Sequence, residues 1–222
     1  MLRKVLSVFI FLLLCSGYIF AQGPQVVAQG TPEIYTVTIK KVELYNSTTS
    51  SWVTVGEGDM SFNIAEAETA GEKVGDYISN KSIPEGVYTH IRLTVSRIMT
   101  IKGRAEGAGV TYYTTSISYS PQSIVGLETA KASTDPSDYD VTSILTPIEQ
   151  DPNDPTPPQV IGDYFIDTNE LPQPLEIKKG VRRKIRVSFD LANTLEIFKD
   201  TDPGQTLFVV PREPRSSISL ID

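Results

Sequence analysis

Hydrophobic and polar residues alternate along many short stretches of this chain, which is the period of a β-strand. In the stretch IYTVTIKKVELY, residues 34–45, the apolar positions change parity halfway: Tyr35, Val37 and Ile39, then Val42 and Leu44. A strand changes faces in this way only where it contains an extra residue. The pattern therefore predicts a β-bulge or sharp bend at Lys40 and Lys41, followed by a hairpin whose partner strand is WVTV, residues 52–55.

Two further stretches alternate in the same way. Residues 87–96 divide into a mostly apolar face and a mostly polar face: Val87, Thr89, Ile91, Leu93 and Val95 against Tyr88, His90, Arg92, Thr94 and Ser96. In residues 181–191 the basic side chains lie on the face opposite the apolar ones. Together with Lys178 and Lys179, the basic side chains of this strand form a basic stripe: Arg182, Lys184 and Arg186. The stripe is interpreted as a solvated sheet face, and binding of an anionic polymer is the alternative.

A sustained helical period is missing almost everywhere. Residues 65–77 come closest, but Gly71 and Gly75 weaken a helix there. The other predicted strands are Met60–Ile64, Val110–Tyr119, Ser123–Leu127, Val160–Ile166, Leu175–Ile177, Thr206–Val210 and Ser217–Ile221. Many short strands separated by Gly, Pro, Asn and Ser turns predict an all-β protein, an antiparallel β-sandwich.

The stretch from Glu128 to Gln159 departs from this texture. It is acidic, and five of its six prolines follow Thr146. Because proline cannot donate to a sheet ladder, the stretch is interpreted as a long acidic, proline-rich loop inserted into one sandwich domain, residues 22–222.

The N-terminus has the organisation of an export signal. Arg3 and Lys4 precede an apolar run that is shorter than the roughly 20 residues of a membrane-spanning helix. We expect residues 1–21 to be a signal peptide, with cleavage after Ala21 and no stable membrane span afterwards. Lipoprotein anchoring through Cys15 is the alternative, but Leu14 stands where a small residue is required. Both interpretations predict a secreted or cell-surface protein.

Cysteine content and charge exclude several classes of function. The chain has one cysteine, Cys15, so the exported protein would contain neither a disulfide nor a thiolate site. Its net charge is −7, and residues 128–170 carry ten acidic side chains against Lys131 alone. A nucleic-acid partner is not expected, because such binding requires clustered basic residues on a basic domain.

Candidate chemistry is sparse. His90 is the single histidine, so we expect it to have a structural or surface role rather than a catalytic one. Acidic side chains in DPSDYD and just beyond it are candidate calcium ligands, with a solvated turn as the alternative: Asp135, Asp138, Asp140, Asp151 and Asp154, with Asn153 beside them. No GxSxG elbow or phosphate-binding glycine loop is present. The sequence predicts a protein that is not an enzyme, and calcium is its one candidate cofactor.

The stretches YTVTIKKVELY, WVTV, IPEGVYTHIRLTVSRI and IKKGVRRKIRVSFDL together resemble a family of secreted prokaryotic domains of unknown function. The resemblance covers residues 34–113 and 175–197. It implies export and a prealbumin-like β-sandwich, related in architecture to the immunoglobulin-like sandwiches. The family has no catalytic residues that can be carried over to this sequence.

Two functions remain in view. The first is a non-catalytic structural or adhesive protein of the cell exterior, which could be a subunit of an extracellular filament or assembly. The second is a secreted ligand-binding module, with Trp52 and the ten tyrosines as a platform for carbohydrate. For the first function, the N-terminal segment with Val26, Val27 and Ile34 is the candidate assembly arm, which would add a strand to a neighbouring subunit. A self-packed leader is the alternative for this segment.

Overall fold

The computed structural model describes residues 25–66, 83–119, 129–145, 159–179, 184–200, 206–212 and 214–221. The described chain is almost entirely strand, and every strand pairing in it is antiparallel, which confirms the all-β, antiparallel prediction. The strands are β1 (Gln25–Gly30), β2 (Pro32–Asn46), β3 (Ser51–Asn63), β4 (Gly86–Ser96), β5 (Ile98–Gly107), β6 (Val110–Tyr119), β7 (Thr129–Ser133), β8 (Thr142–Leu145), β9 (Gln159–Ile161), β10 (Tyr164–Ile177), β11 (Lys184–Asp190), β12 (Leu195–Lys199), β13 (Leu207–Pro211) and β14 (Arg215–Ile221). Two short 3-10 helices, η1 (Ile64–Glu66) and η2 (Pro136–Asp138), interrupt them.

The predicted bulge in β2 is present. The pairing of β2 with β3 and with β4 shifts between Ile39 and Lys41 on both sides of the strand. Val37 is buried before the bulge, and Val42 and Leu44 are buried after it. One extra residue therefore keeps both apolar sets on the core side of the sheet.

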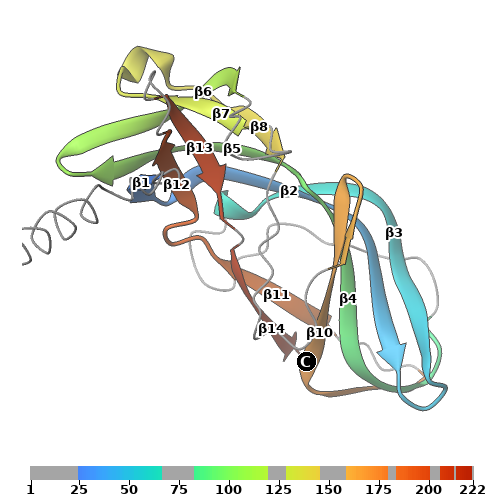
Figure 1. The fold of residues 1–222 in the computed structure, drawn as a ribbon. Coiled ribbons are helices and arrows are strands. Elements are labelled where there is room, and N and C mark those ends of the chain that lie inside the picture. Colours follow the sequence, from blue (N-terminus) through green and yellow to red (C-terminus); the bar gives the residue numbers. More distant parts are fainter. Residues whose placement is uncertain are drawn as a thin grey trace, which may run out of the picture.

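At one end of the molecule the sheet closes into a ring of six strands in the order β1-β12-β13-β7-β6-β5 (Figure 1). The ring closes where Gln29 of β1 pairs with Glu106 of β5. β1 and β2 follow each other in the chain, and both pair with β5. The other edge of β1 pairs with β12, so β1 lies between β5 and β12. The predicted sandwich therefore does not describe this end, because β1 joins two sheet edges that a sandwich leaves apart.

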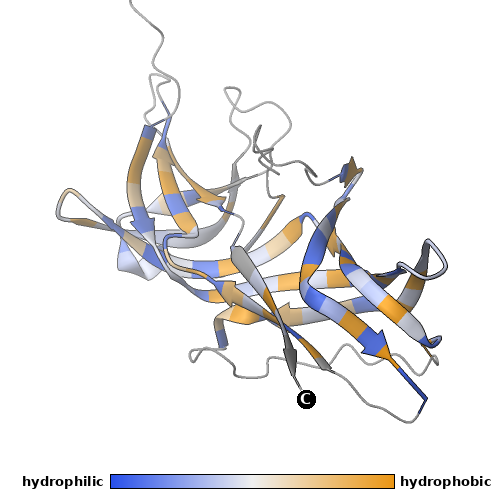
Figure 2. Ribbon diagram, turned by 90° about the horizontal axis from the view of Figure 1, so that it is seen from below, coloured by the Kyte–Doolittle hydropathy of each residue, from blue (hydrophilic) through white to orange (hydrophobic). Residues whose placement is uncertain are grey.

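The long sheet extends from this barrel in the order β3-β2-β4-β10-β9. Figure 2 shows hydrophobic and hydrophilic residues alternating along its strands. The strands β11 and β14 form a separate two-stranded sheet, and its residues Ile185, Phe189 and Ile218 pack against the core. Buried residues of the barrel, such as Leu195, and of the long sheet, such as Leu44, belong to one continuous cluster.

The interpretation of residues 128–159 as a loop is wrong for residues 129–133 and 142–145, which form β7 and β8. β7 pairs with β6 and β13, and β8 pairs with β5. Ala130 and Ile144, from these two strands, are 0% and 2% exposed. The strands TAKAS and TSIL contain no proline, and the prolines that suggested a loop mostly follow Thr146, outside the described residues. A composition averaged over the whole stretch hid two core strands.

The predicted faces of β4 hold only in part, because Thr94 and Ser96 of the predicted polar face are buried, at 9% and 8% exposed. Ile91, Leu93 and Val95 are buried as expected. Tyr88 was predicted on the polar face, but it is 0% exposed. Its hydroxyl donates a hydrogen bond of 2.8 Å to the carbonyl oxygen of Pro84, which allows the ring to be buried without an unsatisfied polar group.

Several predictions lie outside the described residues. These are the signal peptide at residues 1–21, the strand at Ser123–Leu127 and most of the weak helix at residues 65–77, of which Ala65 and Glu66 are seen in η1. No helix within the described ranges has the length and hydropathy needed to cross a membrane.

Candidate ligand-binding face

One row of rings crosses the long sheet at a single register. Tyr45 of β2 lies opposite Trp52 of β3 and opposite His90 of β4. Directly opposite residues share a face of the sheet, and the ring centroids are 5.3 Å apart for Tyr45 and Trp52 and 5.8 Å apart for Tyr45 and His90. All three side chains are half-buried, so part of each remains accessible to a ligand.

The next row holds an ion cluster. Glu43 of β2 lies opposite Thr54 and Arg92. One Glu43 carboxylate oxygen accepts a hydrogen bond of 2.9 Å from Nε of Arg92 and lies 2.8 Å from Nη2 of the same guanidinium, and the other oxygen lies 2.9 Å from Nζ of Lys41. The guanidinium carbon of Arg92 is 4.2 Å from the centre of the Trp52 ring. Glu43 therefore fixes Arg92, and Arg92 fixes the orientation of Trp52.

The environment of Glu43 keeps it ionised. Its side chain is 8% exposed, and this burial by itself raises the pKa of the carboxyl. The hydrogen bonds from Lys41 and Arg92 and their positive charges outweigh burial and hold the pKa of Glu43 below its ordinary value of 4.5. A carboxylate that is held ionised and occupied by two cations is poorly suited to act as a general acid.

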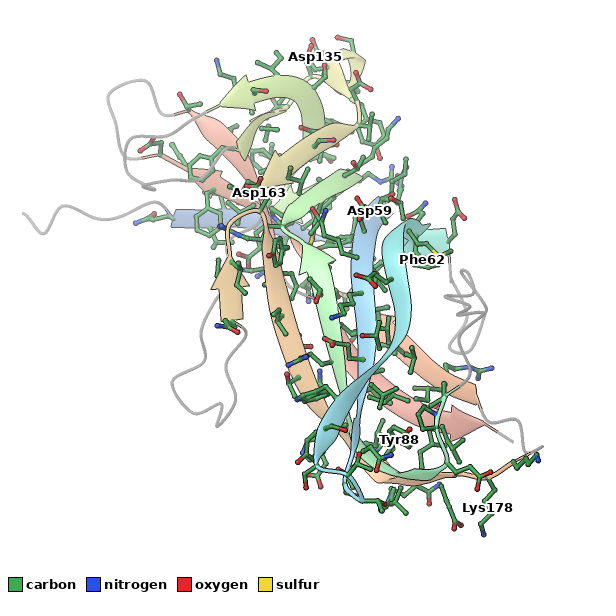
Figure 3. The ribbon with its side chains drawn as sticks, turned by 90° about the vertical axis from the view of Figure 1, so that its right-hand side faces the viewer. Asp59, Phe62, Tyr88, Asp135, Asp163 and Lys178 are labelled. Carbon is green, nitrogen blue, oxygen red and sulfur yellow. The ribbon has the colours of Figure 1, made fainter. Side chains whose placement is uncertain are left out.

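Hydroxyl groups continue the same face beyond the bulge. Thr38 Oγ1 and Ser61 Oγ are 2.8 Å apart, and Thr100 Oγ1 and Ser143 Oγ are 3.0 Å apart. Near them, Lys40 Nζ and an Asp59 carboxylate oxygen are 3.4 Å apart, and Figure 3 places Asp59 near the barrel end of β3. We call the surface made by the following residues the hydroxyl–aromatic face: Thr38, Lys40, Lys41, Glu43, Tyr45, Trp52, Thr54, Asp59, Ser61, His90, Arg92, Thr100 and Ser143.

His90 lies on the polar side of β4, where the sequence places it. Its Nδ1 is 2.9 Å from Oγ1 of Thr89, and its ring meets Tyr45 edge-on at 88°. Across the strand on its other side it pairs with Glu170 of β10. These contacts make His90 a member of the ring row.

The candidate calcium ligands that can be seen are engaged in local turns. The Asp135 carboxylate accepts hydrogen bonds from the backbone and side chain of Ser137, which lower the pKa of Asp135. Asp138 accepts from Ser133, and Asp140 accepts from the backbone of Val141. Asp151 and Asp154 lie outside the described residues. Within the described ranges, no three His, Cys, Asp or Glu side chains form a group that could hold a metal ion.

The candidate assembly arm pairs within its own chain. Val26 belongs to β1 and lies opposite Phe198 of β12, and its side chain is 44% exposed. Val27 packs against the core, while Ile34 is half-buried in β2. In this chain the segment is therefore a strand of the barrel.

The basic stripe is in part neutralised. Lys178 pairs with Glu176 at 2.9 Å, and both side chains are exposed. On β11, Arg186 and Asp190 are exposed as predicted, whereas Ser188 is half-buried like Val187 and Phe189 beside it. Arg182 is outside the described residues.

Sequence reasoning singled out His90 and, as a carbohydrate platform, Trp52 and the tyrosines, but it did not assign Glu43 and Lys41 to this face. Tyr45, Glu43 and Lys41 follow at intervals of two along β2, and this alternation of ring, acid and base on the solvent side was the available signal. What could not be read was the register that sets Arg92 beside Glu43.

A second aromatic cluster also escaped sequence reasoning. Tyr139 packs against Tyr113, with ring centroids 5.5 Å apart, and Lys102 Nζ is 4.5 Å from the centre of the Tyr139 ring. The Tyr139 hydroxyl is buried without a hydrogen-bond partner among the described residues. Burial, and then the nearby Glu33 carboxylate, raise the pKa of Tyr139 far above its ordinary value. These contacts fasten the segment between β7 and β8 onto the barrel.

The family model described as a domain of unknown function (DUF4382) matches residues 31–208. The chain belongs to this family. The match of the DUF4382 domain spans the long sheet and most of the barrel, and it includes both stretches on which the resemblance was based. Comparisons with curated proteins and with solved structures return no match.

Proposed function

We propose that this DUF4382 domain is a non-catalytic binding protein of the cell exterior, adhesive in role, and that the hydroxyl–aromatic face contacts a glycan. The observation that carries the proposal is the row of Trp52, Tyr45 and His90 across three strands. Aromatic rings stack on the apolar faces of sugars while neighbouring polar groups meet their hydroxyls.

The ion cluster supports binding rather than catalysis. Arg92 is held by a hydrogen bond and an ion pair to Glu43 while it stacks on Trp52, so the ring is oriented before any ligand arrives. Preorganised groups lose little conformational entropy on binding. The carboxylate that would have to carry proton transfer is itself engaged by Lys41 and Arg92.

Export is part of the proposal and rests on residues 1–21. The exported protein is expected to begin at Gln22. The intact mass of the protein recovered outside the cytoplasm tests this. A mature form that begins at a diacylated Cys15 would replace the free protein by a membrane-anchored one.

Loss of binding on removal of the Trp52 ring tests the proposed site. On a glycan array and on whole-cell surfaces, Trp52→Ala is expected to weaken binding about tenfold, since one aromatic contact contributes about 0.5–1.5 kcal/mol beyond its buried area. The matched control is Ile117→Ala, because Ile117 is an exposed apolar residue (52%) on β6 of the barrel. Equal binding by the wild type and Trp52→Ala, with equal circular dichroism, would remove the face from the proposal.

A second candidate function is that of a subunit in an extracellular assembly formed by strand addition. It is favoured by β9, an edge strand of the long sheet, whose Val160 and Ile161 are 43% and 38% exposed. Light scattering over a concentration series tests it. Association that Val160→Lys abolishes would support assembly, and a monomer at every concentration would contradict it.

A further inference from the structure

We infer that the ligand of the hydroxyl–aromatic face is an uncharged polysaccharide, bound as an extended chain along the strands. This inference rests on the proposed function and specifies the class of ligand.

The charges of the face argue against a polyanion. Lys41 and Arg92 both contact Glu43, and Lys40 contacts Asp59. Each of these cations is already matched by a carboxylate of the same surface. An anionic polymer would have to compete with the carboxylates for these cations, whereas an uncharged polymer leaves the pairs intact.

The hydroxyl groups match the chemistry of a sugar. The pairs formed by Thr38 with Ser61 and by Thr100 with Ser143 come from four strands, namely β2, β3, β5 and β8. A hydroxyl both donates and accepts, so these groups can exchange hydrogen bonds with the hydroxyls of a carbohydrate in either direction.

The length of the face argues for a polymer. From Thr38 to Tyr45 along β2 the face extends over eight residues, which at about 3.3 Å per residue is roughly 25 Å. A monosaccharide would meet only one end of this surface, and an open sheet face surrounds a small ligand far less than a pocket does. An extended chain can contact the ring row and the hydroxyl pairs together, and its contacts act in concert.

Affinity electrophoresis of the exported chain measures its binding to polysaccharides. The probes are gels that contain an uncharged β-glucan, an uncharged mannan, an uncharged starch glucan, or the anionic polymers polygalacturonate and dextran sulfate. We expect at least one uncharged polysaccharide to retard the protein, with less than about a twofold change in affinity between low and high salt. Short oligosaccharides of the same sugar are expected to compete at least about tenfold more weakly, in units of sugar concentration.

Two variants separate the parts of the face. Trp52→Ala is expected to lower the affinity for the polysaccharide about tenfold, and Trp52→Phe to retain most of it. Thr38→Val removes a hydroxyl from the far end of the face at nearly constant volume. It is expected to lower the affinity for the polymer about threefold and to leave the affinity for a short oligosaccharide unchanged. Circular dichroism confirms that each variant is folded.

The possible failures are distinct. Retardation by the anionic polymers alone, lost at high salt and dependent on Trp52, would overturn the uncharged ligand and keep the binding face. Equal affinity for oligosaccharide and polymer would overturn the extended chain. Binding that does not depend on Trp52 would overturn the proposed function itself.

Discussion

At the scale of single residues, the order of the binding face depends on Glu43. Its carboxylate is buried and holds Arg92, and Arg92 in turn covers one side of the Trp52 ring. Sequence alone indicated Trp52 as part of a carbohydrate-binding platform, because it is the single tryptophan of the chain. It did not indicate Glu43, because an isolated acidic residue in an alternating strand is usually solvated.

Removing the charge of Glu43 should therefore cost stability. Glu43→Gln is expected to lower the free energy of unfolding by about 1–3 kcal/mol, because it leaves two half-buried cations without their shared carboxylate. Urea denaturation measures the change. Asp59→Asn is the control, since Asp59 is 66% exposed and its pair with Lys40 should contribute about 0.5 kcal/mol or less. Equal effects of the two substitutions would contradict the ion cluster.

The stability that Glu43 provides should depend on pH. The pKa of Glu43 is lower in the folded chain than its ordinary value of 4.5, so ionisation favours the folded state. The difference in unfolding free energy between wild type and Glu43→Gln is thus expected to be complete above pH 4.5 and to shrink as the pH falls through the lower folded pKa. A difference that grows on acidification would mean that burial outweighs the two cations.

At the scale of secondary-structure elements, the local features were predictable and the closure was not. The bulge at Lys40 and Lys41 could be read because period two makes a change of parity visible. The barrel could not, because nothing local in residues 25–30 specifies that β1 pairs with β12, which lies far along the chain. The strands β7 and β8 were hidden by the prolines that follow them.

A substitution at the close contact between β1 and β5 tests the closure of the barrel. A methyl group at Gly107 would overlap the carbonyl oxygen of Val27 and lie 2.9 Å from the Cα atom of Ala28. Gly107→Ala is expected to destabilise the protein by about 2–3 kcal/mol and to raise hydrogen exchange in β1 and β12.

The matched control lies in the same hairpin. Gly109 has open space around it but a φ of +77°, so Gly109→Ala should cost about 1 kcal/mol and leave exchange in β1 unchanged. Equal effects of the two variants on exchange would show that β1 is not held against β5 as described.

At the scale of the whole molecule, buried residues of the barrel and of the long sheet belong to one continuous core. Because the core is continuous, the two parts are expected to unfold together. Trp52, the only tryptophan, reports on the long sheet, whereas Gly107 lies in the barrel. Gly107→Ala should therefore shift the midpoints of Trp52 fluorescence and of circular dichroism by the same amount. A shift in circular dichroism alone would indicate two independent units.

The same residue gives the most direct test of the binding face. Because the chain contains a single tryptophan, its fluorescence during titration with the polysaccharide that retards the protein reports on this surface alone. We predict a saturable change in Trp52 emission, with protection from acrylamide quenching, at the concentrations at which binding occurs. Saturable binding that leaves both the emission and the quenching of Trp52 unchanged would contradict the account.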